Sequence, residues 1–302
     1  MTVVSRPRLR RTLMALLAAF ATAATVTSGA LFAAERYLAA PFEGVGEDGR
    51  LTLLFLGSDA GPPRPGSPIE DARADGFHIV SVSQDRTKVS ILSFPRDSYV
   101  PVAGQGTTKI NSCLVNGPDS CVETAAGLTG IEFDGYMVTS FQGFVRGVNA
   151  LGGVEVDVEI ALNDSFSNSN LQPGLQVLDG DTALTYVRDR KSRPKGDLDR
   201  AEAHARFLQA THTQLTSQGN SLDDIHRLIS ILRATTLTDL SSSDLFRLAN
   251  VALAIDPANV QRLRIDSSAG MAGSASVVYI SDTGYAQIAD IAEDGVIGPA
   301  DG

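Results

Sequence analysis

The chain has no tryptophan, and aromatic residues make up only 6% of its 302 residues. A carbohydrate-binding platform built on indole stacking is therefore excluded. The chain also lacks a Gly-x-Ser-x-Gly elbow and a P-loop, which removes support for a serine-triad hydrolase and for nucleoside triphosphate chemistry. Positive charge is in deficit as well, since the formal net charge is −10 at pH 7. This acidic balance argues against a nucleic-acid partner.

Cysteine is also scarce. Cys113 and Cys121 are the only two in the chain, and they flank the sequence Asn116-Gly117-Pro118. In an exported protein this spacing predicts a local disulfide that pins a turn, and two buried free thiols are the alternative. Two cysteines this close, without a supporting histidine, make a poor zinc site.

Charge is absent altogether from residues 12–34, which are mostly apolar. As a helix this stretch would be about 35 Å long, enough to cross the core of a bilayer. Basic residues precede the stretch and acidic residues follow it: Arg6, Arg8, Arg10 and Arg11, then Glu35, Glu43, Glu47 and Asp48. Residues 1–11 are therefore predicted to be a cytoplasmic basic tail, 12–34 a transmembrane signal anchor, and 35–50 a linker outside the membrane.

A cleaved signal peptide is the alternative to this anchor. Leu13–Phe20 would be its apolar region and Ala21-Thr22-Ala23 its cleavage site. Both interpretations place the functional part outside the cytoplasm. The anchor predicts a single-pass protein of the cell membrane with its functional domain on the extracytoplasmic side.

The remaining part of the chain, about 265 residues, shows strand patterns that alternate with helix patterns. The pattern predicts strands at 51–56, 77–83, 89–94, 136–141, 154–158, 260–265 and 277–280. It predicts helices within 120–128 and 144–150 and at 200–214, 221–234 and 241–253, with a loop at 163–174. Such alternation indicates an α/β fold with a sheet covered on both faces.

One cationic island interrupts this acidic chain. Residues 186–200 contain six Lys/Arg and three Asp. Ala183–Val187 is predicted to end a strand, so that Arg188 and Arg190 project from one face, and Asp197 or Asp199 is predicted to cap a helix that opens near Arg200. Guanidinium forks beside a helix N-terminus suit a phosphate or pyrophosphate. The alternative is a solvated charge run in a surface loop.

Further charged residues stand at predicted strand ends or in the loops next to them: Asp59, Arg73, Asp75, Arg96, Lys109, Arg188 and Arg190. Ligands of open α/β sheets gather beyond the carboxyl ends of the strands. Carboxylates that hold Mg²⁺ and arginines that clamp phosphate oxygens would together bind a metal-bridged pyrophosphate. The alternative is that each carboxylate pairs locally, Arg73 with Asp75 and Arg96 with Asp97.

With these residues in view, the chain resembles the LytR-CpsA-Psr family of bacterial cell-wall proteins. The matching pieces occur in the family's order and span about 145 residues: Leu-Gly-Ser-Asp (56–59), Arg-Ala-Asp (73–75), Ser-Phe-Pro-Arg-Asp-Ser-Tyr-Val (93–100), Lys-Ile-Asn (109–111), Phe-Gln-Gly-Phe (141–144), Ala-Leu-Gly-Gly-Val-Glu-Val (150–156), Leu-Asp-Gly-Asp-Thr-Ala-Leu-Thr-Tyr-Val-Arg-Asp-Arg (178–190) and Gly-Asp-Leu-Asp-Arg (196–200). The resemblance places the catalytic domain at 51–282 and leaves a C-terminal tail at 283–302.

The resemblance implies a three-layer α/β/α domain with a central mixed sheet and an apolar channel for a polyprenyl chain. It implies an enzyme that transfers a glycopolymer from a polyprenyl-pyrophosphate carrier to peptidoglycan at the membrane. Position by position, it implies Asp59 and Asp75 as Mg²⁺ ligands. It implies a pyrophosphate-binding set of Arg73, Arg96, Lys109, Arg188, Arg190, Asp197 and Arg200.

The chain departs from the family pattern in three places. Ala74 stands where the family usually has threonine, and Ser140 where an aspartate is common. Ala203, His204 and Ala205 replace a second arginine and glutamines, a loss that Arg206 is expected to offset. We assign the catalytic role to Arg96, Asp97, Arg188 and Arg190, with Asp97 either the general base or a structural partner of a neighbouring arginine.

Two other functions are compatible with the same residues. In the first, water replaces the sugar hydroxyl and the protein is a polyprenyl-pyrophosphate pyrophosphatase. In the second, the protein binds prenyl phosphates without catalysis and tethers wall polymers. The identity of the glycopolymer and the oligomeric state have no signature in the sequence.

Overall fold

A computed structural model describes residues 49–59, 72–219 and 221–298, all of which belong to one unit, Glu43–Gly302. The predicted basic tail (1–11) and signal anchor (12–34) lie outside the described residues, as does most of the predicted linker. Within the described ranges, no helix combines the length and apolarity that a membrane crossing requires.

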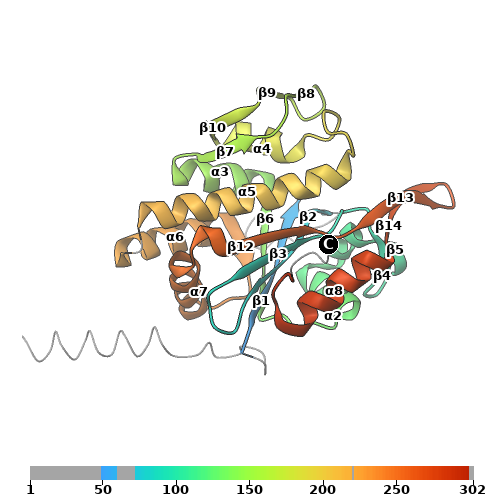
Figure 1. Ribbon diagram of the computed structural model, residues 1–302, viewed down its shortest axis with the longest axis horizontal. Coiled ribbons are helices and arrows are strands. Elements are labelled where there is room, and N and C mark those ends of the chain that lie inside the picture. The colour runs from blue at the N-terminus through green and yellow to red at the C-terminus, as the bar shows by residue number, and fades with distance from the viewer. Residues whose placement is uncertain (1–48, 60–71, 220, 299–302) are drawn as a thin grey trace, which may run out of the picture. The chain divides into compact units, whose positions relative to one another are not determined.

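A six-stranded mixed sheet forms the centre of the fold, in the order β11-β6-β1-β2-β3-β12 (Figure 1). β1 pairs in parallel with β6, and β3 with β12, whereas β2 is antiparallel to both its neighbours and β11 is antiparallel to β6. The strands of this sheet are β1 (Leu51–Ser58), β2 (Ala74–Val82), β3 (Val89–Ser93), β6 (Gly135–Ser140), β11 (Thr236–Thr238) and β12 (Val260–Arg264). The predicted α/β class with a central mixed sheet is confirmed.

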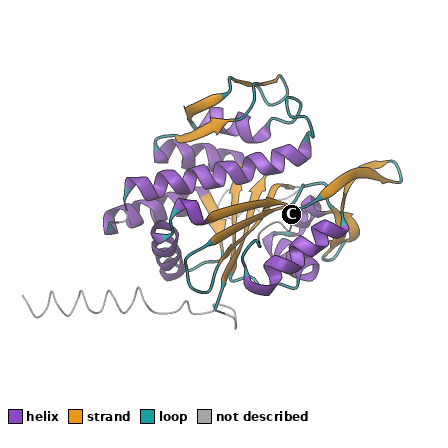
Figure 2. Ribbon diagram, in the orientation of Figure 1, coloured by secondary structure: helices purple, strands orange, loops and turns teal. Residues whose placement is uncertain are grey.

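Helices cover both faces of this sheet (Figure 2). They are α2 (Pro118–Thr129), α3 (Phe141–Leu151), α4 (Gly180–Arg188), α5 (Asp197–Gln218), α6 (Leu222–Thr235), α7 (Ser242–Ala254) and α8 (Asp282–Asp294), with short 3₁₀ helices η1 (Ile110–Asn116) and η2 (Pro257–Asn259). Four two-stranded antiparallel sheets complete the described part: β4 (Tyr99–Val102) with β5 (Gly106–Lys109), β7 (Val154–Val158) with β10 (Gly174–Leu178), β8 (Leu162–Asp164) with β9 (Ser169–Leu171), and β13 (Ser267–Ala272) with β14 (Ala275–Ile280).

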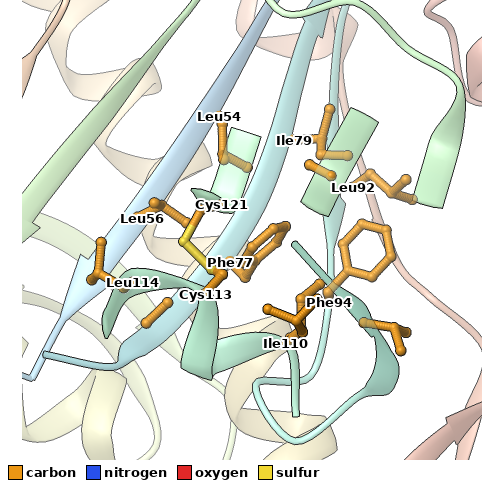
Figure 3. Close-up of a cluster of buried hydrophobic side chains, with 14 of the residues drawn as sticks. Leu54, Leu56, Phe77, Ile79, Leu92, Phe94, Ile110, Cys113, Leu114 and Cys121 are labelled. Carbon is orange, nitrogen blue, oxygen red and sulfur yellow. A yellow bond between two sulfur atoms is a disulfide. The ribbon is translucent and has the colours of Figure 1, made fainter. Parts of the chain in front are cut away.

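Side chains that alternate along β1 and β2 divide the interior into two halves. Leu54 and Phe77 join the main core, which also takes residues from α2 and α8 (Figure 3). Their neighbours Phe55 and His78 line a pocket beneath α3, α4 and α5. β1 is largely an apolar run because both of its faces are covered.

Cys113 and Cys121 form a disulfide that joins η1 to α2. The same 3₁₀ turn braces the loop after β3, because the Ile110 amide donates to the Ser98 carbonyl at 2.8 Å and the Asn111 amide donates to the Arg96 carbonyl at 3.1 Å. The disulfide therefore supports the segment that carries Arg96 and Asp97.

Two predicted segments have a different structure. The predicted strand end at 183–187 is helix α4, whose N-terminus is capped by Asp179 through the Thr182 amide at 2.8 Å. Ala183 and Tyr186, three residues apart, are its buried side chains. Arg188 and Arg190 therefore do not share a strand face. The loop predicted at 163–174 contains the β8–β9 hairpin.

The C-terminal tail assigned to 283–302 contains most of helix α8, whose side chains Ile288 and Ile291 are buried in the main core. The helix forms because Ser281 caps it by accepting from the Gly284 amide at 3.0 Å, and because its apolar positions recur at helical spacing.

Removal of the disulfide should destabilise the domain by about 2–3 kcal/mol, because it closes a short loop and so restricts the unfolded chain. We expect reductant to lower the free energy of unfolding of the wild type, as measured by urea denaturation. The double variant Cys113→Ala, Cys121→Ala should match the reduced protein and not respond to reductant. Equal stability of the oxidised and reduced wild type would contradict this role.

Candidate active site

A pocket of about 120 Å³ lies between the carboxyl end of β1 and helices α3, α4 and α5. Most of its lining is apolar, and Asp75, Arg188 and Arg200 are the charged residues that line it. The apolar side chains are Phe55, Leu56, Phe141, Phe144, Leu184, Val187, Phe207 and Leu208. The pocket thus joins a hydrophobic interior to a charged rim, an arrangement typical of sites for amphipathic ligands.

A bulge in β2 aims Asp75 at this rim. Gly57 pairs with Gly76, whereas Ser58 pairs with Ala74, so Asp75 is an extra residue in the strand. Bulges of this kind redirect a side chain at the edge of a site. The Asp75 carboxylate forms an ion pair and hydrogen bond with Arg96, which follows β3.

Arg96 and Asp97 connect this pair to a second cation. Arg96 Nε lies 3.8 Å from Asp97 Oδ1, and Lys109 Nζ lies 3.2 Å from Asp97 Oδ2. Burial lowers the pKa of Arg96, but the charges of Asp75, Asp97 and Asp197 outweigh it, and the pKa is raised overall. Arg96 therefore stays protonated inside this cluster.

Asp197 and Arg200, on the first turn of α5, form the other half of the cluster. Arg200 Nη2 lies 2.7 Å from Asp197 Oδ1, and Arg190 Nη1 lies 3.4 Å from Asp197 Oδ2. Burial lowers the pKa of Arg200, and Asp197 and Asp75 oppose that shift. Because Arg96 interacts with Asp197, and Arg200 with Asp75, the two halves form one electrostatic site.

Arg188 ends α4 at the pocket wall, with its guanidinium carbon 4.7 Å from the centre of the Phe141 ring. The aromatic face orients the guanidinium by a cation–π interaction. The structure thus brings together eight of the predicted site residues: Asp75, Arg96, Asp97, Lys109, Arg188, Arg190, Asp197 and Arg200.

Asp59 and Arg73 are placed differently. Asp59 Oδ1 accepts from the Arg73 amide at 2.7 Å, and the Asp59 amide donates to the Arg73 carbonyl at 3.1 Å. These contacts lie next to the bulge of β2. Within the described residues no ion pair joins either side chain to the cluster. The alternative pair Arg73–Asp75 does not form, because Asp75 pairs with Arg96.

The carboxylates near the rim supply only part of a metal coordination sphere. In the described ranges, no group of three or more His, Cys, Asp or Glu residues is arranged to hold a metal ion. Mg²⁺ is usually bound by one or two carboxylates together with water and substrate phosphates. Asp59 and Asp75, on adjacent strand ends, fit that limited role.

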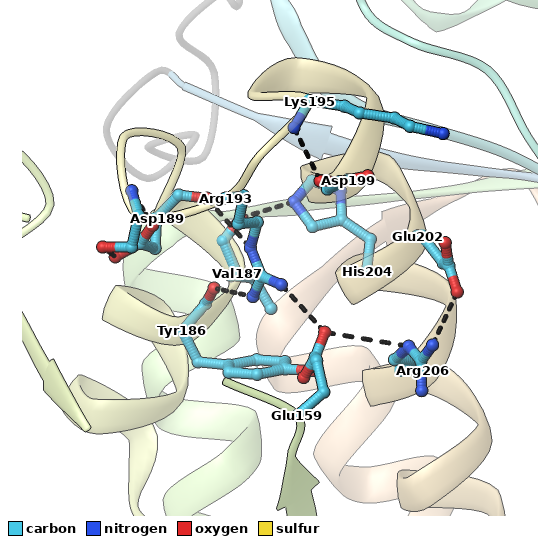
Figure 4. Close-up of polar contacts among 11 residues, drawn as sticks. Glu159, Tyr186, Val187, Asp189, Arg193, Lys195, Asp199, Glu202, His204 and Arg206 are labelled. Atoms are coloured by element: carbon cyan, nitrogen blue, oxygen red, sulfur yellow. Dashed lines mark hydrogen bonds and ion pairs between the residues drawn. The ribbon is translucent and has the colours of Figure 1, made fainter. Parts of the chain in front are cut away.

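Part of the cationic island is structural. The Arg193 side chain is buried, donates to Glu159 Oε1 at 2.8 Å, and stacks 5.1 Å from the centre of the Tyr186 ring (Figure 4). Asp189 is fully buried and accepts from the Ser192 hydroxyl at 2.9 Å. These contacts hold the loop between α4 and α5, so that Arg188, Arg190 and Arg200 are left to face the site.

His78 and His204 are site residues that the sequence analysis did not assign. His204 Nε2 donates to the Val187 carbonyl at 2.7 Å, which leaves Nδ1 as an acceptor at the pocket wall. The two rings lie 5.5 Å apart, and His78 bonds to the Ser93 hydroxyl at 2.8 Å. Both rings approach Gly76, where an added Cβ would lie 3.2 Å from a nitrogen of each.

Both imidazoles are neutral. Burial, followed by the nearby Arg200 charge, lowers the pKa of His204 to about 3, and burial also lowers the pKa of His78. His204 therefore does not replace the positive charge of the second arginine that the family usually has at 203–205. Arg206 does not offset it, because its guanidinium pairs with Glu202 at 2.7 Å and lies 3.7 Å from Glu159 (Figure 4).

A signal for this wall is present in the sequence. Arg200, His204, Phe207 and Leu208 follow the spacing of one helical face, and all four line the pocket. The helical periodicity predicts that these four side chains share one face of α5. It does not predict which residues of the sheet lie opposite that face.

The chain is similar to known proteins in sequence and in fold. The model of the LytR_cpsA_psr family matches residues 21–293. A polyisoprenyl-teichoic acid–peptidoglycan teichoic acid transferase, TagU of Oceanobacillus iheyensis, is 31% identical over 206 residues, which is 66% of this chain and 62% of TagU. The probable cell wall biosynthesis protein LcpB of Corynebacterium glutamicum is 36% identical over 168 residues, 55% of this chain and 40% of LcpB.

The fold matches solved structures over a greater length. The crystal structure of Bacillus subtilis TagV has a TM-score of 0.70 at 23% identity, covering 82% of this chain and 97% of that one. The chain thus spans less than two thirds of the curated relatives above, but nearly all of a solved domain with the same fold.

The two neutral histidines predict a pH dependence of stability. An unfolded histidine has a pKa of about 6.5, so below that pH the unfolded chain binds protons that the folded site excludes. Stability should fall as the pH drops from about 6.5 toward the folded value, by less than about 1.4 kcal/mol per pH unit for each histidine. Urea denaturation at several pH values measures this slope.

His204→Gln should reduce the slope, whereas His226→Gln, at an exposed position of α6, should leave it unchanged. If His204→Gln and the wild type have the same slope, His204 titrates normally in the folded protein and the assignment is wrong.

Proposed function

The chain belongs to the LytR-CpsA-Psr family, and we propose that it transfers a glycopolymer from a polyprenyl-pyrophosphate carrier to peptidoglycan. One observation carries the proposal: an apolar pocket opens beside a cluster of arginines, lysine and aspartates. A polyprenyl pyrophosphate has the same division, a hydrocarbon chain joined to an anionic headgroup. The name of the related TagU describes a reaction of this class.

The charge of the cluster suits such a headgroup. Arg96, Lys109, Arg188, Arg190 and Arg200 face Asp75, Asp97 and Asp197. The cations therefore exceed these carboxylates by a formal charge of two, and this excess of positive charge favours a pyrophosphate diester, which carries two negative charges. Guanidinium forks bind phosphate oxygens in pairs, and their attraction is strengthened where water is excluded.

The polyprenyl chain would occupy the pocket next to the headgroup. Phe144, Leu184 and Phe207 give it an apolar lining, and burial of each methylene contributes about 0.8 kcal/mol. Arg188 and Arg200 stand where the hydrocarbon lining ends. They would therefore contact the phosphate that carries the lipid.

The reaction would be a phosphoryl transfer. A sugar hydroxyl of peptidoglycan attacks the polymer-side phosphorus, a new P–O bond forms, the bond to the bridging oxygen breaks, and polyprenyl phosphate leaves. Charge grows on the bridging oxygen and on the leaving phosphate, where Arg188, Arg190 and Arg200 would stabilise it. Asp97, positioned between Arg96 and Lys109, would accept the hydroxyl proton.

Asp59 and Asp75 would be the protein ligands of Mg²⁺, and the bound metal ion would neutralise phosphate oxygens. The predicted signal anchor would keep the domain on the extracytoplasmic surface of the cell membrane. Enzyme and lipid donor would then be confined to the same surface.

Arg188→Ala should lower the transfer rate by about a hundredfold or more, because it removes one donor that acts on the developing charge. Arg188→Lys should recover only part of the rate, since lysine lacks the planar fork. The measurement is transfer of labelled polymer from a polyprenyl-pyrophosphate donor to peptidoglycan. Arg146→Ala, at an exposed position of α3, is the matched control.

Full activity of Arg188→Ala at unchanged thermal stability would refute the proposal that Arg188 stabilises the charge on the leaving phosphate. Release of polyprenyl phosphate at the same rate with and without peptidoglycan would instead identify a pyrophosphatase. Donor binding without turnover in the presence of Mg²⁺ would identify a binding protein.

A further inference from the structure

Two tyrosines meet at the surface next to the charged cluster. Tyr99 begins β4 and Tyr279 lies near the end of β14, and their rings form an edge-to-face pair with centres 5.9 Å apart. Tyr279 is 40% exposed. Neither the pocket lining nor the ion pairs of the cluster include these side chains, so the mechanism above leaves the pair without a role.

The Tyr279 ring is held rigidly. Its hydroxyl donates to the Met271 carbonyl at 3.0 Å across the hairpin. The ring lies against Gly270, where an added Cβ would approach two ring carbons to 2.8 Å, so any other residue there would displace it. An aromatic face displayed in one fixed orientation binds a partner with little loss of side-chain entropy.

The pair is attached directly to the catalytic segment. The Val278 amide donates to the Asp97 carbonyl at 2.9 Å, and Ser98 forms an isolated parallel bridge with Val278. On the other side, Tyr99 is paired with Lys109 in the β4–β5 hairpin, and Lys109 reaches Asp97 at 3.2 Å. Directly opposed residues of an antiparallel pair share a face, so Tyr99 and Lys109 point to the same side.

The tyrosines also belong to elements that do not line the pocket. The pocket is lined by residues of β1, β2, β6, α3, α4 and α5, whereas β4, β5, β13 and β14 lie together on the right of the sheet in Figure 1. In phosphoryl transfer the attacking and leaving oxygens are roughly in line. If polyprenyl phosphate leaves on the pocket side, the acceptor hydroxyl approaches from the side of Asp97 and the tyrosines.

The hairpin around Tyr279 is suited to a neutral, hydroxylated partner. Residues 267–281 contain no charged side chain, and serine, alanine and glycine are frequent among them. A charged protein surface or a lipid headgroup would find no complementary charge there. A pyranose ring has an apolar face of C–H groups that stacks on an aromatic ring, and hydroxyls that bond to serine and backbone groups.

We propose that Tyr99 and Tyr279 form a sugar-stacking platform that binds the acceptor glycan strand of peptidoglycan and presents its hydroxyl beside Asp97. The proposal rests on the transferase function proposed above, since it assigns the acceptor side of that reaction. In this chain, which has no tryptophan, the two tyrosine rings would provide the stacking surface that indole rings provide elsewhere.

Binding of the full-length chain in detergent to purified peptidoglycan, measured by co-sedimentation without any lipid donor, tests the platform. Tyr279→Ala should weaken binding about tenfold, as expected for the loss of one stacking contact. Tyr279→Phe keeps the ring and should bind within about twofold of the wild type. Tyr285→Ala, at a 48% exposed tyrosine on α8, is the matched control and should bind normally.

Tyr279→Leu keeps apolar bulk over Gly270 but removes the aromatic face. It should therefore also lose binding, and it replaces Tyr279→Ala in the test if that variant does not fold. Undiminished binding of Tyr279→Leu, or an equal loss in Tyr285→Ala, would overturn the proposal. A calorimetric titration with geranylgeranyl pyrophosphate should give the same affinity for wild type and Tyr279→Leu. A loss there would assign the tyrosines to the donor and would also overturn the proposal.

Co-sedimentation requires no turnover, and it therefore separates the platform from the transferase function. A chain that binds peptidoglycan through Tyr279 but transfers no polymer would refute the proposed reaction and retain the platform. If the Tyr279→Leu variant transfers polymer with the same KM for the peptidoglycan acceptor as the wild type, the platform is refuted and the reaction is retained.

Discussion

The ion pair between Arg96 and Asp75 is the contact on which the site depends. It joins the bulge of β2 to the loop after β3, and that loop continues into Asp97, Ser98 and Tyr99. Both side chains are largely shielded from water, with 25% and 15% of their side-chain surfaces exposed. Removal of one partner would leave the other poorly solvated and uncompensated. The pair therefore fixes the cationic rim on one side and, through the same loop, the tyrosine pair on the other.

The surroundings of the loop after β3 strengthen this constraint. The Asn111 amide holds the Arg96 carbonyl, the Val278 amide holds the Asp97 carbonyl, and the disulfide between Cys113 and Cys121 steadies the 3₁₀ turn that carries Asn111. Backbone contacts from two separate segments, η1 and β14, thus converge on Arg96 and Asp97. A site made of charged side chains at strand ends gains precision when its backbone is fixed in this way.

Much of this arrangement could be predicted from the sequence, because some signals are local. The buried strand at 51–56 is recognisable as an apolar run, and the cysteine spacing indicated the local disulfide that the structure contains. The ordered motifs indicated the family, and with it which distant cations to group. Helix α4 was predicted as a strand end because a short apolar run such as Ala183–Val187 fits either structure, and the Asp179 cap that decides between them is a weak signal.

Other features depend on tertiary contacts that no local pattern encodes. The role of His204 is set by the Val187 carbonyl and by His78 from a strand far away in the sequence. In the sequence, Arg193 and Asp189 belong to the cationic island at 186–200. In the structure both side chains are buried, and their contacts stabilise the loop between α4 and α5. Arg206 faces Glu159 and Glu202 because of the helical phase of α5.

The central claim is that the pocket and the charged cluster together hold a polyprenyl phosphate or pyrophosphate. Native mass spectrometry of the full-length chain, purified in mild detergent, tests this most directly. We predict an added mass that fragments to an isoprenoid phosphate, and its loss in a variant that carries Leu184→Asp in the pocket wall. A wild-type protein that carries no such mass, and that takes up none when polyprenyl pyrophosphate is supplied, would contradict the account.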